Sequence, residues 1–246
     1  LHRQLMENAV KTYFSDTKNL LYSFLISLPL FLAYELLILI SQPDASQIVR
    51  ISVDSWFKSI FSLLGVNAVS ITLLAVALLG MIILYKEREQ LKGLKFKFFP
   101  VMIAESTVYA IVVALIATFF VSMVFAFSAN DPISSLSGLQ KFALSLGAGL
   151  YEELFFRVIL VSALILAFQK MFNNKNWAAV TAAVVLSAFL FSLVHYVGSM
   201  GDPFTFSSFA YRFLFGLMLN GIYVWRGFGI AAWTHALYDL LVLFVL

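Results

Sequence analysis

The chain lacks cysteine and has few charged residues. None of its 246 residues is a cysteine, so disulfides and zinc–thiolate sites are excluded. Charged residues make up 12% of the sequence, about half the share that is typical of a soluble domain. There is also no long polar stretch, low-complexity tract or internal repeat. The sequence therefore has no segment that would build a separate soluble domain.

Apolar residues, in contrast, account for 62% of the chain. They gather into runs near the length of about 20 residues that a helix needs to cross a bilayer. About seven candidate spans are present, at roughly 19–40, 61–85, 100–127, 139–168, 177–197, 204–225 and 229–246. A further amphipathic segment, 46–60, could lie at the membrane interface. Because only helices and closed barrels satisfy the backbone in lipid, the sequence predicts an all-α polytopic transmembrane helix bundle.

The basic residues lie mostly in short segments between these spans. If the N-terminus is inside, most lysines and arginines are also inside, including the run Lys86–Lys97, as the positive-inside rule requires. The net charge of +3 then reflects membrane orientation, and we expect no nucleic-acid partner. The polar segment Leu1–Lys18 has no apolar stretch typical of a signal peptide. We predict a multi-pass protein of a prokaryotic plasma membrane, surrounded by lipid bilayer.

Three short ionisable motifs lie within the late spans. A charge in hydrocarbon costs at least ~2.5–3.5 kcal/mol, so such residues usually mark a functional site. The predicted topology brings all three motifs to a similar depth, in the outer half of the membrane. They are Glu152-Glu153-x-x-x-Arg157, Phe191-x-x-x-His195 and His235-x-x-x-Asp239.

The first motif suggests that its two carboxylates have different tasks. Glu153 and Arg157 are four residues apart, which places them on one helix face in the favourable acid-before-base order. Glu152 points about 100° away and is left to face a cavity, where desolvation would make it a usable general base for water. The alternative is a purely structural polar knot between helices.

The other two motifs each pair residues on one helix face. His195 could position water or polarise a carbonyl, or could simply be an interfacial residue, and Phe191 could wall a substrate cavity or pack against a neighbouring helix. Asp239 could orient His235 through a ring N–H bond, and the pair could stabilise an oxyanion, complete a metal site or form an interhelical hydrogen bond.

Isolated charges in the spans are weaker signals. Glu35 and Arg212 both lie nearer the predicted outer side and could pair with each other. Glu105 lies close to the basic loop, where an interfacial position is expected. No His-Glu-x-x-His zinc signature occurs. Two histidines and a carboxylate from separate helices could still bind zinc, but we favour glutamate-activated water with no required cofactor.

The order Glu-Glu-x-x-x-Arg, Phe-x-x-x-His and His-x-x-x-Asp on successive helices resembles the CPBP family of intramembrane proteases. That family includes the type II CAAX prenyl endopeptidases and the bacterial Abi, or bacteriocin self-immunity, proteins. The resemblance covers about Leu150–Leu246. It divides the chain into an N-terminal membrane region, 1–138, and a catalytic helical core, 139–246.

The resemblance implies hydrolysis of a peptide bond within the membrane region. Glu152 would activate water with help from His195, while Glu153 and Arg157 would support the site. His235 and residue 239 would stabilise the oxyanion, although the CAAX endopeptidases carry Asn at that last position.

Those enzymes act on cytosolic C-termini, whereas the predicted topology places this site toward the outer face. We therefore expect a membrane-anchored peptide or protein as the substrate, such as the tail or leader of an exported protein. Two other functions use similar residues. Intramembrane Glu, His and Asp also build the proton relays of transporters, and a non-catalytic immunity or scaffold protein could keep the same fold.

Overall fold

The computed structural model describes residues 2–41, 50, 52–63, 68–124, 136–173, 175–197 and 201–245. Within these ranges every regular element is a helix, which confirms the predicted all-α bundle. Four helical segments are long and apolar enough to cross a membrane, namely Leu20–Ser41, Phe98–Phe120, Gly138–Met171 and Asn176–Val194. The total of about seven crossings and the orientation of the N-terminus stay predictions.

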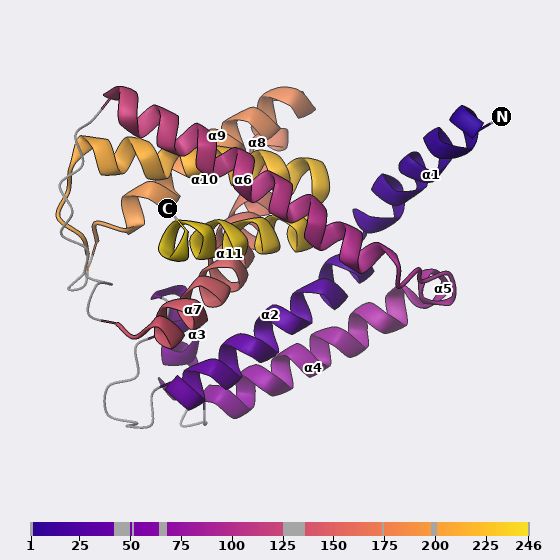
Figure 1. Cartoon of the computed structure of the whole chain (residues 1–246), viewed down its shortest axis with the longest axis horizontal. Helices are drawn as coiled ribbons and strands as arrows, with labels where there is room; N and C mark the ends of the chain where they lie inside the picture. The colour runs from indigo at the N-terminus through magenta and orange to yellow at the C-terminus, as the bar shows by residue number, and fades with distance from the viewer. Residues whose placement is uncertain are drawn as a thin grey trace.

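The N-terminal part of the chain forms six helices. Two of them, α2 and α4, run side by side along one edge of the molecule, whereas α1 projects away from the bundle (Figure 1). The amphipathic segment expected over 46–60 appears as the short helix α3, and residues 46–49 lie outside the described ranges. The bounds are α1 His2–Thr17, α2 Leu20–Ser41, α3 Ser52–Leu63, α4 Ala68–Lys86, α5 Arg88–Lys92 and α6 Phe98–Val124.

The C-terminal part contains all three ionisable motifs. The span expected over 139–168 is one continuous helical run, but its middle is wound as a π-helix. Its parts are α7 Gly138–Gly147, η3 Ala148–Glu152, η4 Leu154–Val161 and α8 Ser162–Met171. The remaining helices are α9 Asn176–Val194, α10 Phe206–Arg226 and α11 Phe228–Phe244.

Helix α11 lies at the centre of the bundle. It packs against α2, α6, α7, α10 and both π-helical segments, and in Figure 1 it runs through the middle of the molecule. Its buried face is built largely of small residues around His235 (Gly229, Ala231, Ala232, Thr234 and Ala236). Small side chains let neighbouring helices approach closely, so the sequence of α11 brings several helices to His235.

A polar cluster secures α1 to the bundle. The Arg226 guanidinium, at the end of α10, pairs with Glu105 of α6 at 2.5 Å. Arg226 also donates to the Thr17 hydroxyl at 2.8 Å and to the Phe14 carbonyl at 3.2 Å. Tyr13 completes the cluster by donating to Glu105 at 2.5 Å. Glu105, which was expected at the interface near the basic loop, therefore holds an N-terminal helix in place.

Candidate active site

The glutamate pair lies in the π-helical segment. Residues 148–152 and 154–161 have π geometry, with α-helical turns before and after them. π-Helices are rare and occur frequently at functional sites. Their wider winding leaves main-chain groups in need of other partners, and the Ser187 hydroxyl of α9 donates to the Phe156 carbonyl at 3.1 Å. The regular α-helix expected from the sequence was wrong for this segment, since no local sequence signal marks a π-helix.

Two glycines allow close contacts on either side of this segment. A Cβ on Gly147 would overlap the Tyr34 ring of α2. A Cβ on Gly149 would lie 2.5 Å from the Ala232 carbonyl oxygen and 2.7 Å from the Ala236 Cβ of α11. A side chain at 149 would collide with the backbone of α11, and one at 147 would displace the Tyr34 ring. Gly149 therefore allows the first motif to lie close to the third.

Glu153 joins the first motif to the third. Its Oε1 lies 3.0 Å from an Arg157 terminal nitrogen and 2.7 Å from Nδ1 of His235. All three side chains are buried, and Glu153 and Arg157 have no exposed area at all. The ion pair predicted from the spacing of four residues is therefore present. The contact with His235 spans 82 positions of the sequence and arises only from the packing of α11 against the π-helical segment.

This arrangement leaves several buried polar atoms without a hydrogen-bond partner. They are Glu153 Oε2 and the three guanidinium nitrogens of Arg157, whose contact with Glu153 lacks hydrogen-bond geometry. The Arg157 guanidinium lies over the Phe191 ring, 4.7 Å from its centroid. Buried polar groups are nearly always satisfied, so each exception calls for an explanation. Here the unsatisfied atoms belong to Glu153 and Arg157 of the first motif.

Glu152, next to this pair, is half-buried. Among the described residues, its carboxylate forms no ion pair or side-chain hydrogen bond. Its charged neighbours are His235, Arg157, Glu153 and Arg212. Unlike Glu153, Glu152 has a carboxylate that no fixed partner occupies.

His195 caps the C-terminus of α9. Its Nδ1 lies 2.8 Å from the Phe191 carbonyl oxygen. A carbonyl can only accept, so Nδ1 carries the proton and donates, which leaves Nε2 with a lone pair in the neutral ring. His235 is close enough to interact electrostatically with His195. The packing therefore brings the second and third motifs together.

Asp239 does not form the hydrogen bond with His235 that was expected. Its Oδ2 is 3.7 Å from Nε2 of His235, which is beyond hydrogen-bond distance. The ring is instead oriented through Nδ1 by Glu153 and by an edge-on contact with Phe215. The expectation that Asp239 orients His235 through a ring N–H bond was therefore wrong, because Asp239 lies too far from Nε2 and the ring is held at its other nitrogen by Glu153.

Phe191 is almost fully buried, with 2% of its surface exposed. Its ring packs edge-on against Phe156 and His195, and Arg157 covers its face. Of the two alternatives, packing against neighbouring helices is the one observed here. A contact between Phe191 and a substrate stays a prediction.

Arg212 was not identified as a site residue from the sequence. The expected pairing with Glu35 was wrong, because Arg212 pairs with Asp202 at 2.5 Å and donates to the Tyr196 hydroxyl at 2.8 Å. Asp202 in turn donates its backbone N–H to the His195 carbonyl at 2.9 Å. Arg212 therefore secures the chain that follows His195. The only sequence signal for a role of Arg212 was that it is a lone arginine in an apolar span.

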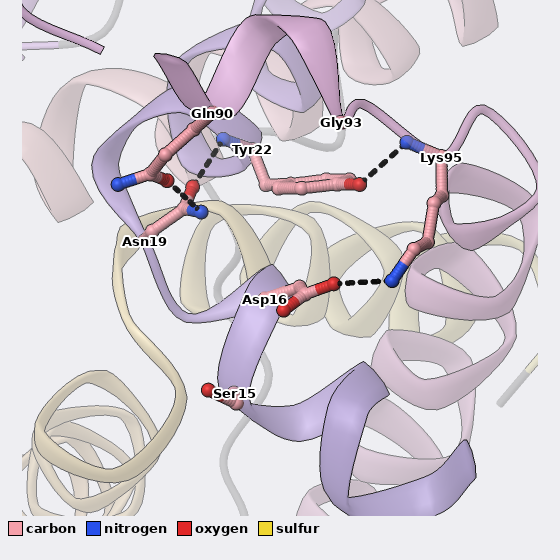
Figure 2. Close-up of a pocket in the computed structure, with 7 residues that line it drawn as sticks. All are labelled: Ser15, Asp16, Asn19, Tyr22, Gln90, Gly93 and Lys95. Carbon is pink, nitrogen blue, oxygen red and sulfur yellow. Dashed lines mark hydrogen bonds and ion pairs between the residues drawn. The ribbon is translucent and has the colours of Figure 1, made fainter.

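A second feature, far from these residues in the sequence, is a cavity of about 470 Å³ where α1 and α2 meet the segment around α5. Figure 2 shows that most of its polar side chains bind each other. Asp16 pairs with Lys95 at 2.9 Å, Asn19 with Gln90, and the Tyr22 hydroxyl accepts from the Lys95 backbone N–H at 2.7 Å. Because these bonds join α1 and α2 to the segment around α5, they hold the helices together at the cavity.

Fold and site together define a helical membrane protein with a buried or half-buried cluster of two glutamates, an arginine, two histidines and an aspartate. Residues 134–241 match the family model described as type II CAAX prenyl endopeptidase Rce1-like. The match includes all three motifs, and it confirms the resemblance inferred from them. Neither the curated proteins nor the solved structures gave a match to the chain.

Proposed function

We propose that this protein is an intramembrane endopeptidase that hydrolyses a peptide bond in or near a membrane-embedded substrate segment. The family match over 134–241 supports a CAAX-type intramembrane protease. One observation carries the more detailed proposal. Glu153 is fixed by Arg157 and His235, whereas the adjacent carboxylate of Glu152 forms no hydrogen bond or ion pair with any side chain that the structure describes.

In the proposed reaction, Glu152 and His195 bind the attacking water. The Glu152 carboxylate removes one proton as the water oxygen bonds to the substrate carbonyl carbon. Nε2 of His195 has its lone pair available because Nδ1 donates to the Phe191 carbonyl. It therefore accepts a hydrogen bond from the second O–H of the water and orients the nucleophile. When the C–N bond breaks, Glu152 returns its proton to the leaving amine nitrogen.

His235 is proposed to stabilise the negative charge that develops on the carbonyl oxygen. Its ring lies between Glu153 at Nδ1 and Asp239 at Nε2. Flanked by two carboxylates, the ring can carry both protons and donate Nε2–H to the oxyanion. The negative charge of Asp239 then favours the doubly protonated form of the His235 ring. Arg157 and Glu153 hold His235 in place.

No metal ion takes part in these steps. In the described part of the chain, no group of three or more His, Cys, Asp or Glu side chains is arranged to hold a metal ion. Zinc bound by the histidines and a carboxylate is the alternative, and the chemistry of the donors permits it. A chelator therefore belongs in the decisive experiment.

The test is cleavage of membrane-tail peptides by purified protein in lipid nanodiscs. Wild type is compared with Glu152→Gln, which keeps the shape of the side chain but removes the base. The matched control is Glu89→Gln, which changes an exposed acid of α5 whose ion-pair partners among the described residues are Lys92 and Arg88. We expect cleavage by wild type and the control, and cleavage at least about 100-fold slower by Glu152→Gln.

The same assay is repeated with a chelator and with added zinc. Cleavage that persists with the chelator supports glutamate-activated water. Loss with the chelator and recovery with zinc would instead make His195, His235 and an acidic residue metal ligands. Equal cleavage by wild type and Glu152→Gln would refute the assigned role of Glu152.

A further inference from the structure

A second group of buried charges lies outside the region that matches the family model. We name Glu35, Arg50, Asp54 and Lys58 the N-terminal ion cluster. Lys58 donates to Glu35 at 2.5 Å and to Asp54 at 2.6 Å. Arg50 donates to Asp54 at 2.9 Å and to Glu35 at 3.3 Å. The side chains are 0–10% exposed, so two acids and two bases neutralise each other within the bundle.

Two tyrosines bind this cluster from two different helices. The Tyr34 hydroxyl of α2 donates to Asp54 at 2.8 Å. The Tyr151 hydroxyl of η3 donates to Glu35 at 2.9 Å. Tyr151 directly precedes Glu152. The proposed general base is therefore one residue away from a fixed, charge-assisted hydrogen bond.

Helix α3 reinforces this connection with ring contacts. Trp56 packs edge-on against Phe155 of η4, with centroids 5.9 Å apart. Phe57 contacts both Tyr151 and Phe155 at 6.5 Å. Since Asp54 and Lys58 belong to the same helix, α3 is held by its charges and covers the π-helical segment with its aromatic side chains.

The π-helical segment needs such support to keep its winding. An unfavourable backbone conformation persists only where the surrounding structure fixes it. If residues 148–161 returned to α geometry, each turn would contain fewer residues and the side chains of Glu152 and Glu153 would rotate relative to α11. The contacts at Tyr151 and Phe155 oppose this change on one side, and Ser187 opposes it on the other.

We propose that Tyr151 is a positioning residue, and that the N-terminal ion cluster acts through it to hold the π-helical turn in which Glu152 faces the site. The catalytic part of this inference rests on the proposed function. The N-terminal region then contributes to the site, because it fixes the orientation of the Glu152 side chain.

The test compares Tyr151→Phe with Tyr34→Phe. Each substitution removes one hydroxyl from the same ion cluster and keeps the ring, but only Tyr151 belongs to the helix that carries Glu152. Amide hydrogen exchange is measured for the full-length protein in nanodiscs. We expect exchange across 148–161 to rise by at least about threefold in Tyr151→Phe, the effect of losing one hydrogen bond. Tyr34→Phe should leave that segment within twofold of wild type.

This measurement needs no substrate, so its result is independent of the peptidase proposal. Unchanged exchange over 148–161 in Tyr151→Phe, or an equal rise in both variants, would overturn the positioning role. If cleavage is established, Tyr151→Phe should lower kcat and leave KM unchanged, while Tyr34→Phe keeps both. An equal loss of kcat in the two variants would assign the cluster to stability alone.

Discussion

The N-terminal ion cluster and the candidate site are both groups of charged side chains within the described bundle, and they differ in how completely their polar atoms are satisfied. In the N-terminal ion cluster, both carboxylates contact both cations, and two tyrosines add further hydrogen bonds. In the site, Glu153 Oε2 and all three guanidinium nitrogens of Arg157 form no hydrogen bond with the described residues, although Arg157 is ion-paired with Glu153. Glu152 has no ion-pair partner among the described residues.

This difference suggests that one group holds helices together and that the other binds another molecule. A fully satisfied buried network makes the surrounding structure rigid, and such a network is suited to holding helices together. Unsatisfied buried groups are costly, so a protein keeps them where another molecule can satisfy them. The proposed function has such a molecule, since water and a substrate would enter beside these residues. Substitutions in the two groups should therefore affect different measurements.

The largest expected effect is on catalysis at Glu152. Glu152→Gln should lower kcat by about 10²- to 10⁴-fold, the usual contribution of a general base. The melting temperature should change little, because no ion pair is broken. Steady-state cleavage and thermal unfolding in the same detergent check both parts. A large drop in Tm with modest loss of kcat would place Glu152 with the structural group.

The N-terminal ion cluster should show the opposite behaviour. Lys58→Met leaves Glu35 and Asp54 with a single cation, Arg50. Removing one partner of a buried pair costs about 3–5 kcal/mol, so a strong fall in Tm is expected. The control is Lys92→Met, which breaks the exposed pair with Glu89. If the two lysine variants melted alike, the buried cluster would contribute no more than a surface pair.

A smaller effect is expected at Asp239. Asp239→Asn should keep kcat within about tenfold of wild type, a change of about 1.4 kcal/mol. The carboxylate makes no hydrogen bond to His235 at 3.7 Å, and the amide can donate to an oxyanion. Asp239→Leu, which can neither donate nor carry charge, should be slower than Asp239→Asn. Inactivity of Asp239→Asn would show that the negative charge itself is required.

The smallest effect is expected at the surface. Glu89→Gln removes the charge from a residue whose side chain is 72% exposed and paired with Lys92 at 2.8 Å. Exposed pairs contribute little because solvent screens them. Neither Tm nor cleavage should change measurably. A clear loss of stability would mean that this short helix has a larger role than its exposure indicates.

Much of this molecule could be predicted from the sequence because its signals are local. Long apolar runs indicated the helices, and a spacing of four residues indicated the Glu153–Arg157 pair. The three motifs, matched by the family model over 134–241, indicated which residues would gather at the site. Each of these signals depends on neighbouring positions of the chain and on the cost of burying charge, and both can be read before the fold is known.

Other features depended on which helices pack together. Glu35 pairs with Lys58 and Arg50 rather than with Arg212, since α3 lies against α2. Glu153, not Asp239, holds Nδ1 of His235.

The sequence by itself therefore determined a helical membrane protein and the set of ionisable residues at its candidate site. Only the tertiary structure decided which partners they have on other helices and that the segment carrying Glu152 is wound as a π-helix. The physical reason is distance along the chain: Glu153 and His235 are 82 positions apart, and their contact depends on the close approach of helices at Gly149 and the small residues of α11.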